Sequence, residues 1–155
     1  MAVHGVSRST RDLDLLTLAE SCLATEFWNE LRTPGIEAQV RRGDADDPLA
    51  GVVRLTRAGE HPLDIVIGKS PWQTGIFDRV HETHIEDVSV PVVSRVDLIL
   101  LKLFAGGPQD LWDVEQLLTG PDRAALSAEV ERSLTALPAS CREGWARVRG
   151  NAGTC

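Results

Sequence analysis

Apolar and polar residues alternate along several stretches of the chain, as they do in strands that bury one face. The first such stretch, DLDLLTL at residues 12–18, follows a turn rich in glycine and serine. The others are rich in β-branched residues and lie at residues 36–40, 51–57, 62–68 and 88–93. The sequence AGEH before residue 62 predicts a tight hairpin turn. We therefore expect residues 36–68 to form an antiparallel meander.

Other stretches place apolar residues three or four positions apart, which is the spacing of one helix face. Leu23, Phe27 and Leu31 have this spacing, and Pro34 cannot continue their helix. A later helix has Ser94 as its expected N-cap and a pair of glycines as its stop. The expected helices span residues 19–31, 71–81, 95–105 and 108–119, with one or two more within 122–148.

The order of these elements predicts an α+β fold, with a mixed or antiparallel sheet and helices packed on it. A chain of 155 residues is expected to form one domain with a buried core. Within that domain, we expect residues 1–120 to form the α/β core. Residues 121–155 are expected to form a C-terminal helical appendage with a frayed tail.

Composition and charge narrow the function classes. The formal net charge of −7 disfavours general affinity for nucleic acid, although it does not exclude a local anion site. The chain has neither a run of about 20 apolar residues nor the apolar segment of a secretory signal near Met1, so we expect no membrane partner. The three cysteines lie far apart without metal-ligand spacing, which indicates reduced thiols in a cytoplasmic protein.

Two acids, Asp12 and Asp14, flank Leu13 in the first strand-like stretch. Residues two apart on a strand point to the same side, so both carboxylates should face one place and Leu13 the core. Adjacent carboxylates repel each other unless a cation shares the site, and Mg²⁺ prefers such oxygen ligands. Asp64, a single acid in an apolar strand, is the candidate third ligand. The alternative is that all three are solvated acids at strand ends or edges.

Two segments resemble small bacterial nucleotidyltransferases. HGVSRSTRDLDLL is similar to their pattern H-G-x-x-R-x-T-x-D-[ILV]-D-[IL]-[LM]. VVSRVDLILLKLFAGGPQDLWDVEQLL is similar to a later block, in which an apolar helix with one lysine is followed by a turn and Q/K-D-x-x-D. Both blocks occur in the family's order, and the resemblance covers about residues 1–119. More loosely, the chain resembles AbiEii-type toxins of type IV toxin–antitoxin systems.

The resemblance implies a nucleotidyltransferase-like fold and assigns roles by position. Asp12 and Asp14 match the metal-binding acids. Asp64 matches the third acid, which serves as a metal ligand or as a general base for the attacking hydroxyl. The residues expected to meet phosphate, or to order the loop beside it, are Arg8, Ser9, Thr10, Lys102 and Asp110.

A simpler role is open for the later residues of this set. Lys102 is one of only two lysines, and it can reach solvent along its helix or pair with Asp110 or Asp113. Asp110 lies in a first helical turn, where the helix dipole favours an acid whatever the function. Asp113 is interpreted as a residue of the helix surface.

The resemblance departs from the family pattern at the N-terminus. Active relatives have a Gly-Gly or Gly-Ser turn before H-G, whose backbone amides hold nucleotide phosphates, whereas Met1 begins just after that place. Either the chain belongs to a longer protein, or it is a shortened relative with a weaker grip on phosphate.

The expected activity is Mg²⁺- or Mn²⁺-dependent transfer of a nucleoside monophosphate from an NTP to a hydroxyl acceptor. The acceptor is a tRNA end, a protein or a small molecule. The alternative is a non-catalytic module that binds a nucleotide or a protein, as a component of a toxin–antitoxin pair. A D-x-D glycosyltransferase is a weaker option, because the chain is short and lacks a Rossmann pattern.

Overall fold

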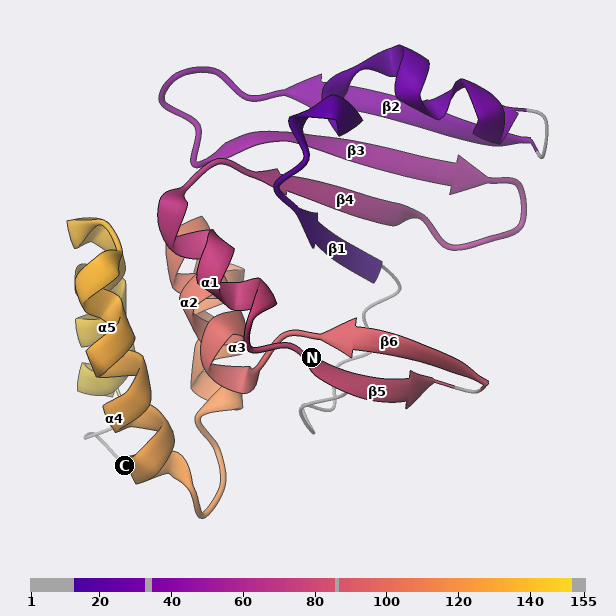
Figure 1. Ribbon diagram of the computed structural model, residues 1–155. Coiled ribbons are helices and arrows are strands. Elements are labelled where there is room, and N and C mark those ends of the chain that lie inside the picture. Colours follow the sequence, from indigo (N-terminus) through magenta and orange to yellow (C-terminus); the bar gives the residue numbers. More distant parts are fainter. Residues whose placement is uncertain (1–12, 33–34, 86, 152–155) are drawn as a thin grey trace. The chain divides into compact units, whose positions relative to one another are not determined.

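The computed structural model describes residues 13–32, 35–85 and 87–151 (Figure 1). The chain divides into two compact units, one ending at Thr74 and the other containing Gly75 and the residues after it. We call residues 13–74 the sheet unit and residues 75–151 the helical unit, and each is described by itself. The expected α+β class is confirmed, because a mixed sheet and helices both occur.

The sheet unit contains a four-stranded mixed sheet in the order β1-β4-β3-β2. Its strands are β1 (Leu13–Thr17), β2 (Ile36–Arg42), β3 (Leu49–Arg57) and β4 (Leu63–Gly68). The antiparallel pairing of β2 with β3 and of β3 with β4 confirms the predicted meander. β1 runs parallel to β4 and lies at the edge of the sheet.

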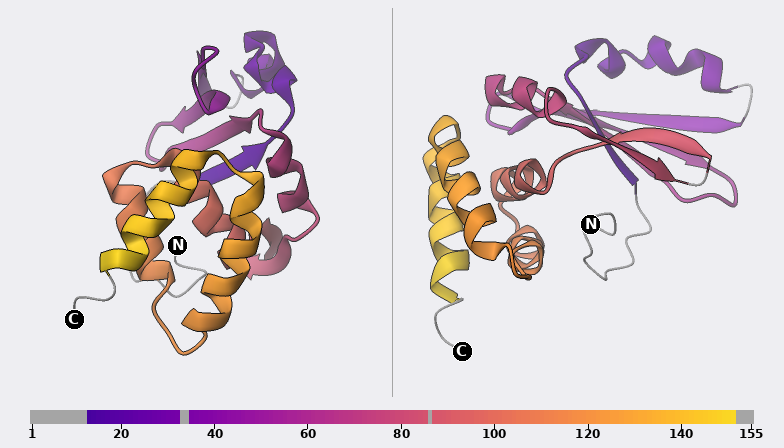
Figure 2. Two further views of the ribbon diagram at one scale, coloured as in Figure 1. Left: turned by 90° about the vertical axis from the view of Figure 1, so that its left-hand side faces the viewer. Right: turned by 60° about the horizontal axis from the view of Figure 1, so that its bottom comes forward.

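One face of this sheet is covered by two short helical segments, η2 (Glu20–Leu23) and η3 (Thr25–Arg32) (Figure 2). The predicted helix at 19–31 is thus helical but broken into two 3-10 pieces at Ala24, whose backbone is extended. The Trp28 indole donates a hydrogen bond of 2.7 Å to the carbonyl of Cys22, and so satisfies a carbonyl that the break leaves without a helical partner.

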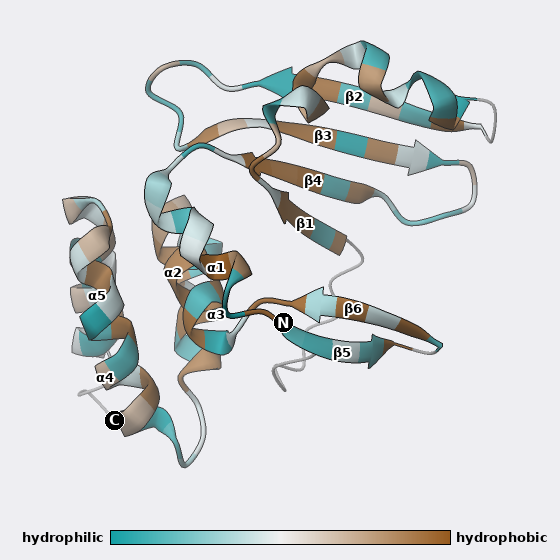
Figure 3. Cartoon of the chain, viewed as in Figure 1, coloured by the Kyte–Doolittle hydropathy of each residue, from teal (hydrophilic) through white to brown (hydrophobic). Residues whose placement is uncertain are grey.

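The core of the sheet unit joins Cys22, Leu23 and Trp28 to buried side chains of β3 and β4. Apolar and polar residues alternate along these strands (Figure 3), so the apolar side meets η2 and η3. The expectation that Leu13 belongs to the core is wrong. Leu13 pairs with Leu63 and lies on the same face of the sheet as Ile65, but it is 60% exposed at the edge strand.

The helical unit contains a hairpin that sequence reasoning found only in part. The segment predicted as a helix over 71–81 forms η4 (Pro71–Gln73) and α1 (Thr74–Phe77), and it then becomes strand β5 (His81–Ile85). β5 pairs antiparallel with β6 (Val88–Val92), which confirms the strand predicted at 88–93. The polar sequence HETHI lacks the alternation that would predict a strand, because most of its side chains on both faces are exposed.

The remaining helices are α2 (Arg95–Ala105), α3 (Pro108–Leu117), α4 (Arg123–Ser133), η5 (Leu134–Ala136) and α5 (Ala139–Asn151). Ser94 caps α2 as predicted, since its hydroxyl oxygen accepts from the Asp97 amide at 3.0 Å. Gly106 ends α2 with a left-handed φ of 69°. α4 and α5 both pack on α2, so the segment after residue 121 shares the core of this unit (Figure 2). None of the described helices combines the length and apolar character needed to cross a membrane.

Candidate functional site

Asp14 and Asp64 lie opposite each other on neighbouring strands. β1 and β4 run parallel, and their register pairs Asp14 with Asp64 and Leu15 with Ile65. Ile65 belongs to the core under η2 and η3, so strand alternation puts both carboxylates on the other face of the sheet. Adjacent strands lie about 4.8 Å apart, which lets the two side chains reach one small cation.

Arg54 continues the same row on the next strand. Register pairs it with Asp64 across β3 and β4. The guanidinium binds the carboxylate with both arms, from Nε to Oδ1 at 2.8 Å and from Nη2 to Oδ2 at 2.5 Å. The Asp64 side chain is 16% exposed and that of Arg54 is 36% exposed, so water only partly screens the pair.

The pKa of Asp64 is lowered, first by its hydrogen bond from Arg54. Burial opposes this effect, and the charges of Arg54 and Arg41 add to it. Asp64 therefore stays ionised at neutral pH, where it is a good oxygen donor to a cation and a weak proton acceptor. This favours the role of ligand over that of general base.

The sequence contained a signal for Arg54 that our reasoning did not use. In a hairpin, the residues at equal distances from the turn face each other. Arg54 and Asp64 stand at equal distances from Gly59, which lies in the AGEH turn. A hairpin centred on Gly59 pairs Arg54 with Asp64, whereas one centred in the middle of AGEH, between Gly59 and Glu60, would shift the pairing by one residue.

Lys102 and Asp110 also lie together, in the helical unit. Nζ of Lys102 binds Oδ1 of Asp110 at 2.9 Å and Oδ2 of Asp113 at 3.0 Å. The simpler prediction, that Lys102 pairs with one of these acids, is confirmed for both. The prediction that Asp113 lies on the helix surface is wrong, because its side chain is fully buried. Contact of Lys102 with a triphosphate stays a prediction.

These contacts account for the ionisation of Lys102. Burial alone would lower the pKa of its ammonium group, but the hydrogen bonds to Asp110 and Asp113 and the charges of these two acids together raise that pKa. Asp110 also accepts from the Gly107 amide at 3.3 Å, at the start of α3. The cluster therefore ties α2 to the first turn of α3.

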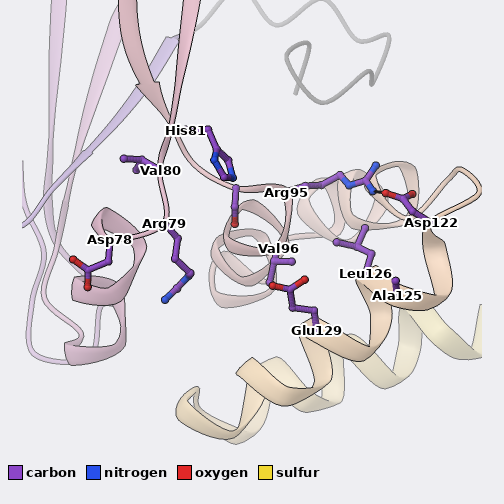
Figure 4. A pocket seen from close by; sticks show the side chains of 11 residues that line it. Asp78, Arg79, Val80, His81, Arg95, Val96, Asp122, Ala125, Leu126 and Glu129 are labelled. Carbon is purple, nitrogen blue, oxygen red and sulfur yellow. Dashed lines mark hydrogen bonds and ion pairs between the residues drawn. The ribbon is translucent and has the colours of Figure 1, made fainter.

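A cavity of about 500 Å³ lies in the helical unit between β5, the start of α2 and α4 (Figure 4). Arg79 and Arg95 line it, and each is bound by an acid. Arg79 binds the fully buried Asp97 at 2.6 Å, and Arg95 binds Asp122 at the start of α4. Asp78 and Glu129 also line the cavity, so its acidic side chains outnumber its two arginines.

Several predicted site residues lie outside the described part of the chain, namely Arg8, Ser9, Thr10 and Asp12. Among the residues that the structure does describe, no three histidine, cysteine or acidic side chains gather around a common point. The predicted metal trio includes Asp12, so its geometry stays a prediction.

Comparison of the chain with protein-family models and with curated proteins found no match. A relationship to nucleotidyltransferases therefore stays a prediction, which rests on the two segments that resemble that family.

Proposed function

We propose that the chain has a nucleotidyltransferase-like fold and transfers a nucleoside monophosphate from an NTP to a hydroxyl acceptor, with Mg²⁺ or Mn²⁺. The observation that carries this proposal is the parallel pairing of β1 with β4, which sets Asp14 directly opposite Asp64. This juxtaposition joins the D-x-D segment to the distant single acid of β4.

The residues fit a hard divalent cation, because carboxylates from two adjacent strands offer the oxygen ligands that it prefers, and the lowered pKa of Asp64 keeps that group ionised. Asp14 and Asp64 would hold the ion, and the family resemblance assigns Asp12 to the same ion. When bound there, the ion would neutralise phosphate charge and align the reacting groups. The acceptor hydroxyl attacks the α-phosphorus, its proton passes to solvent or a nearby base, and the bond to pyrophosphate breaks.

A second candidate is a non-catalytic module that binds a nucleotide or a protein partner, such as one half of a toxin–antitoxin pair. The observation in its favour is the two-armed bond from Arg54, which already compensates the charge of Asp64. In a module of this kind Arg54 would stand permanently in place of a metal ion.

The two candidates are separated by incubating the full chain with each labelled NTP, Mg²⁺ or Mn²⁺, and fractions that supply tRNA, protein or small-molecule acceptors. We expect label transfer by the wild type, and its loss in Asp14→Asn, which keeps the shape of the side chain and removes its charge. Asp46→Asn is the matched control. Asp46 is an exposed loop acid, and its backbone amide, rather than its carboxylate, donates a hydrogen bond of 2.9 Å to Oδ1 of Asp44.

Transfer that survives Asp14→Asn unchanged would contradict the catalytic proposal. Nucleotide binding without transfer, measured by calorimetry and equal in both variants, would favour the non-catalytic module. Absence of both transfer and metal-dependent nucleotide binding would refute the catalytic candidate and the nucleotide-binding form of the second candidate.

A further inference from the structure

The face of the sheet that carries the acids also carries arginines, and the acids and the arginines lie on different strands. Asp14 and Asp64 occupy β1 and β4, while Arg54 occupies the same row on β3. Arg41 alternates onto this face of β2, close enough for its charge to act on Asp64. One side of this surface therefore suits a cation, and the adjoining side suits an anion.

Arg54 and a metal ion would compete for the same atoms. The guanidinium engages both oxygens of Asp64, and these are the oxygens that a cation would need. A metal that takes Asp64 therefore displaces the fork of Arg54. The displaced guanidinium of Arg54 would still lie on β3, next to the strand that holds the ion. Its two parallel N–H donors match the oxygens of a phosphate as well as those of a carboxylate.

We propose that Arg54 is an exchangeable counter-ion, which holds Asp64 when no metal is bound and binds the polyphosphate of the substrate once a divalent ion has taken Asp64. This inference rests on the proposed function and adds to it Arg54 as the residue that binds the phosphates. Its side chain is 36% exposed, so it is open to a ligand from solvent. Lys102, the cation that the family pattern suggests for this task, is instead held by two acids.

The exchange predicts opposite effects of one substitution on two ligands. Arg54→Gln removes the competitor, so Mn²⁺ alone should bind about 5-fold more tightly, as expected for loss of a partly screened ion pair. The same variant loses a two-armed phosphate contact, so inorganic triphosphate in the presence of Mn²⁺ should bind at least about 10-fold more weakly. A role confined to stabilising the hairpin would not produce this pair of opposite changes.

Arg57→Gln is the matched control on the same strand. Arg57 alternates onto the other face of β3, and its ion pair is with Glu60. It should change neither affinity. Arg54→Lys keeps the charge but not the pair of parallel donors, so its affinity for each ligand should lie between those of wild type and Arg54→Gln. It replaces Arg54→Gln in the test if circular dichroism shows that Arg54→Gln does not fold.

Affinities are measured by calorimetry for triphosphate and by electron paramagnetic resonance for Mn²⁺. If Mn²⁺ binds wild type and Arg54→Gln equally, the inference is overturned and the proposed function stands. If Mn²⁺ binds the variant more tightly but triphosphate binding is unchanged, the phosphate role is overturned. If Mn²⁺ binds none of the proteins, both the proposed function and the inference are overturned.

Discussion

Replacing Lys102 by methionine should destabilise the helical unit, because it removes a cationic partner of a buried carboxylate. Asp113 is fully buried, and the ammonium group of Lys102 lies 3.0 Å from it. Breaking a buried ion pair by removing one partner costs about 3–5 kcal/mol. Lys102 itself is 24% exposed, and water that reaches the pair lowers this figure. We expect a loss of about 2–4 kcal/mol, since methionine keeps the apolar packing of the lysine stem.

Urea unfolding followed by circular dichroism at 222 nm measures this loss, because the long α-helices of the chain, α2 to α5, lie in the helical unit. Lys69→Met is the matched control, as Lys69 is the other lysine of the sequence. Lys69 is exposed, and it donates to the carbonyls of Asp44 and Ala45, so its loss should cost less than about 1 kcal/mol. Equal unfolding free energies for the two variants would refute the reasoning.

The pH dependence of the same difference follows from the raised pKa of Lys102. A group whose pKa is raised on folding contributes stability fully below its unfolded pKa, which is about 10.4 for lysine. That contribution is lost as the pH rises through the folded pKa. The gap between wild type and Lys102→Met should therefore be constant near neutral pH and should narrow only above about pH 10.4. A gap that closes between pH 6 and pH 9 would contradict this assignment.

Asp97→Asn should lower the free energy of unfolding in urea by about 3 kcal/mol, because Asp97 is fully buried against the guanidinium of Arg79. Ser94→Ala should lower it by only about 1 kcal/mol, as the loss of an N-cap. Equal losses for the two variants would argue against the importance of the buried ion pair. Gly106→Ala should cost about 1 kcal/mol, because its φ of 69° strains any residue with a Cβ. Gly150→Ala, in α5 with open space around it, should be neutral or slightly stabilising, and a loss like that of Gly106→Ala would contradict the argument.

The elements that the sequence predicted well are those with local signals. Alternation and the AGEH turn defined the meander of β2, β3 and β4, and the cap at Ser94 with the stop at Gly106 defined α2. β5 was missed because a polar two-stranded hairpin buries too little to show a period. The break at Ala24 was missed because the bond from the Trp28 indole that stabilises it is a side-chain contact, which helical spacing does not report.

In the candidate site, too, some features could be predicted from the sequence and others could not. That Asp14 and Asp64 face one place could be predicted from alternation and from neighbouring strands, although their roles remain predictions. The burial of Asp113 and Asp97 could not, because a carboxylate on a helix is buried only when a cation from elsewhere meets it. The sequence shows the acid, and the fold determines its partner.

The parallel pairing at the sheet edge has a consequence for the order in which the acid row assembles. Arg54 and Asp64 lie ten positions apart on one hairpin, and hairpins close in about 1–10 μs. Asp14 comes next to Asp64 only when β1 docks on β4. These two strands are separated in the sequence by η2, η3, β2 and β3, and pairing over such a long separation is slow. We therefore expect Asp64 to meet the arginine before it meets the second aspartate. Asp64 would then be paired with Arg54 while the sheet edge is still open, and Asp14 would join it only when β1 docks.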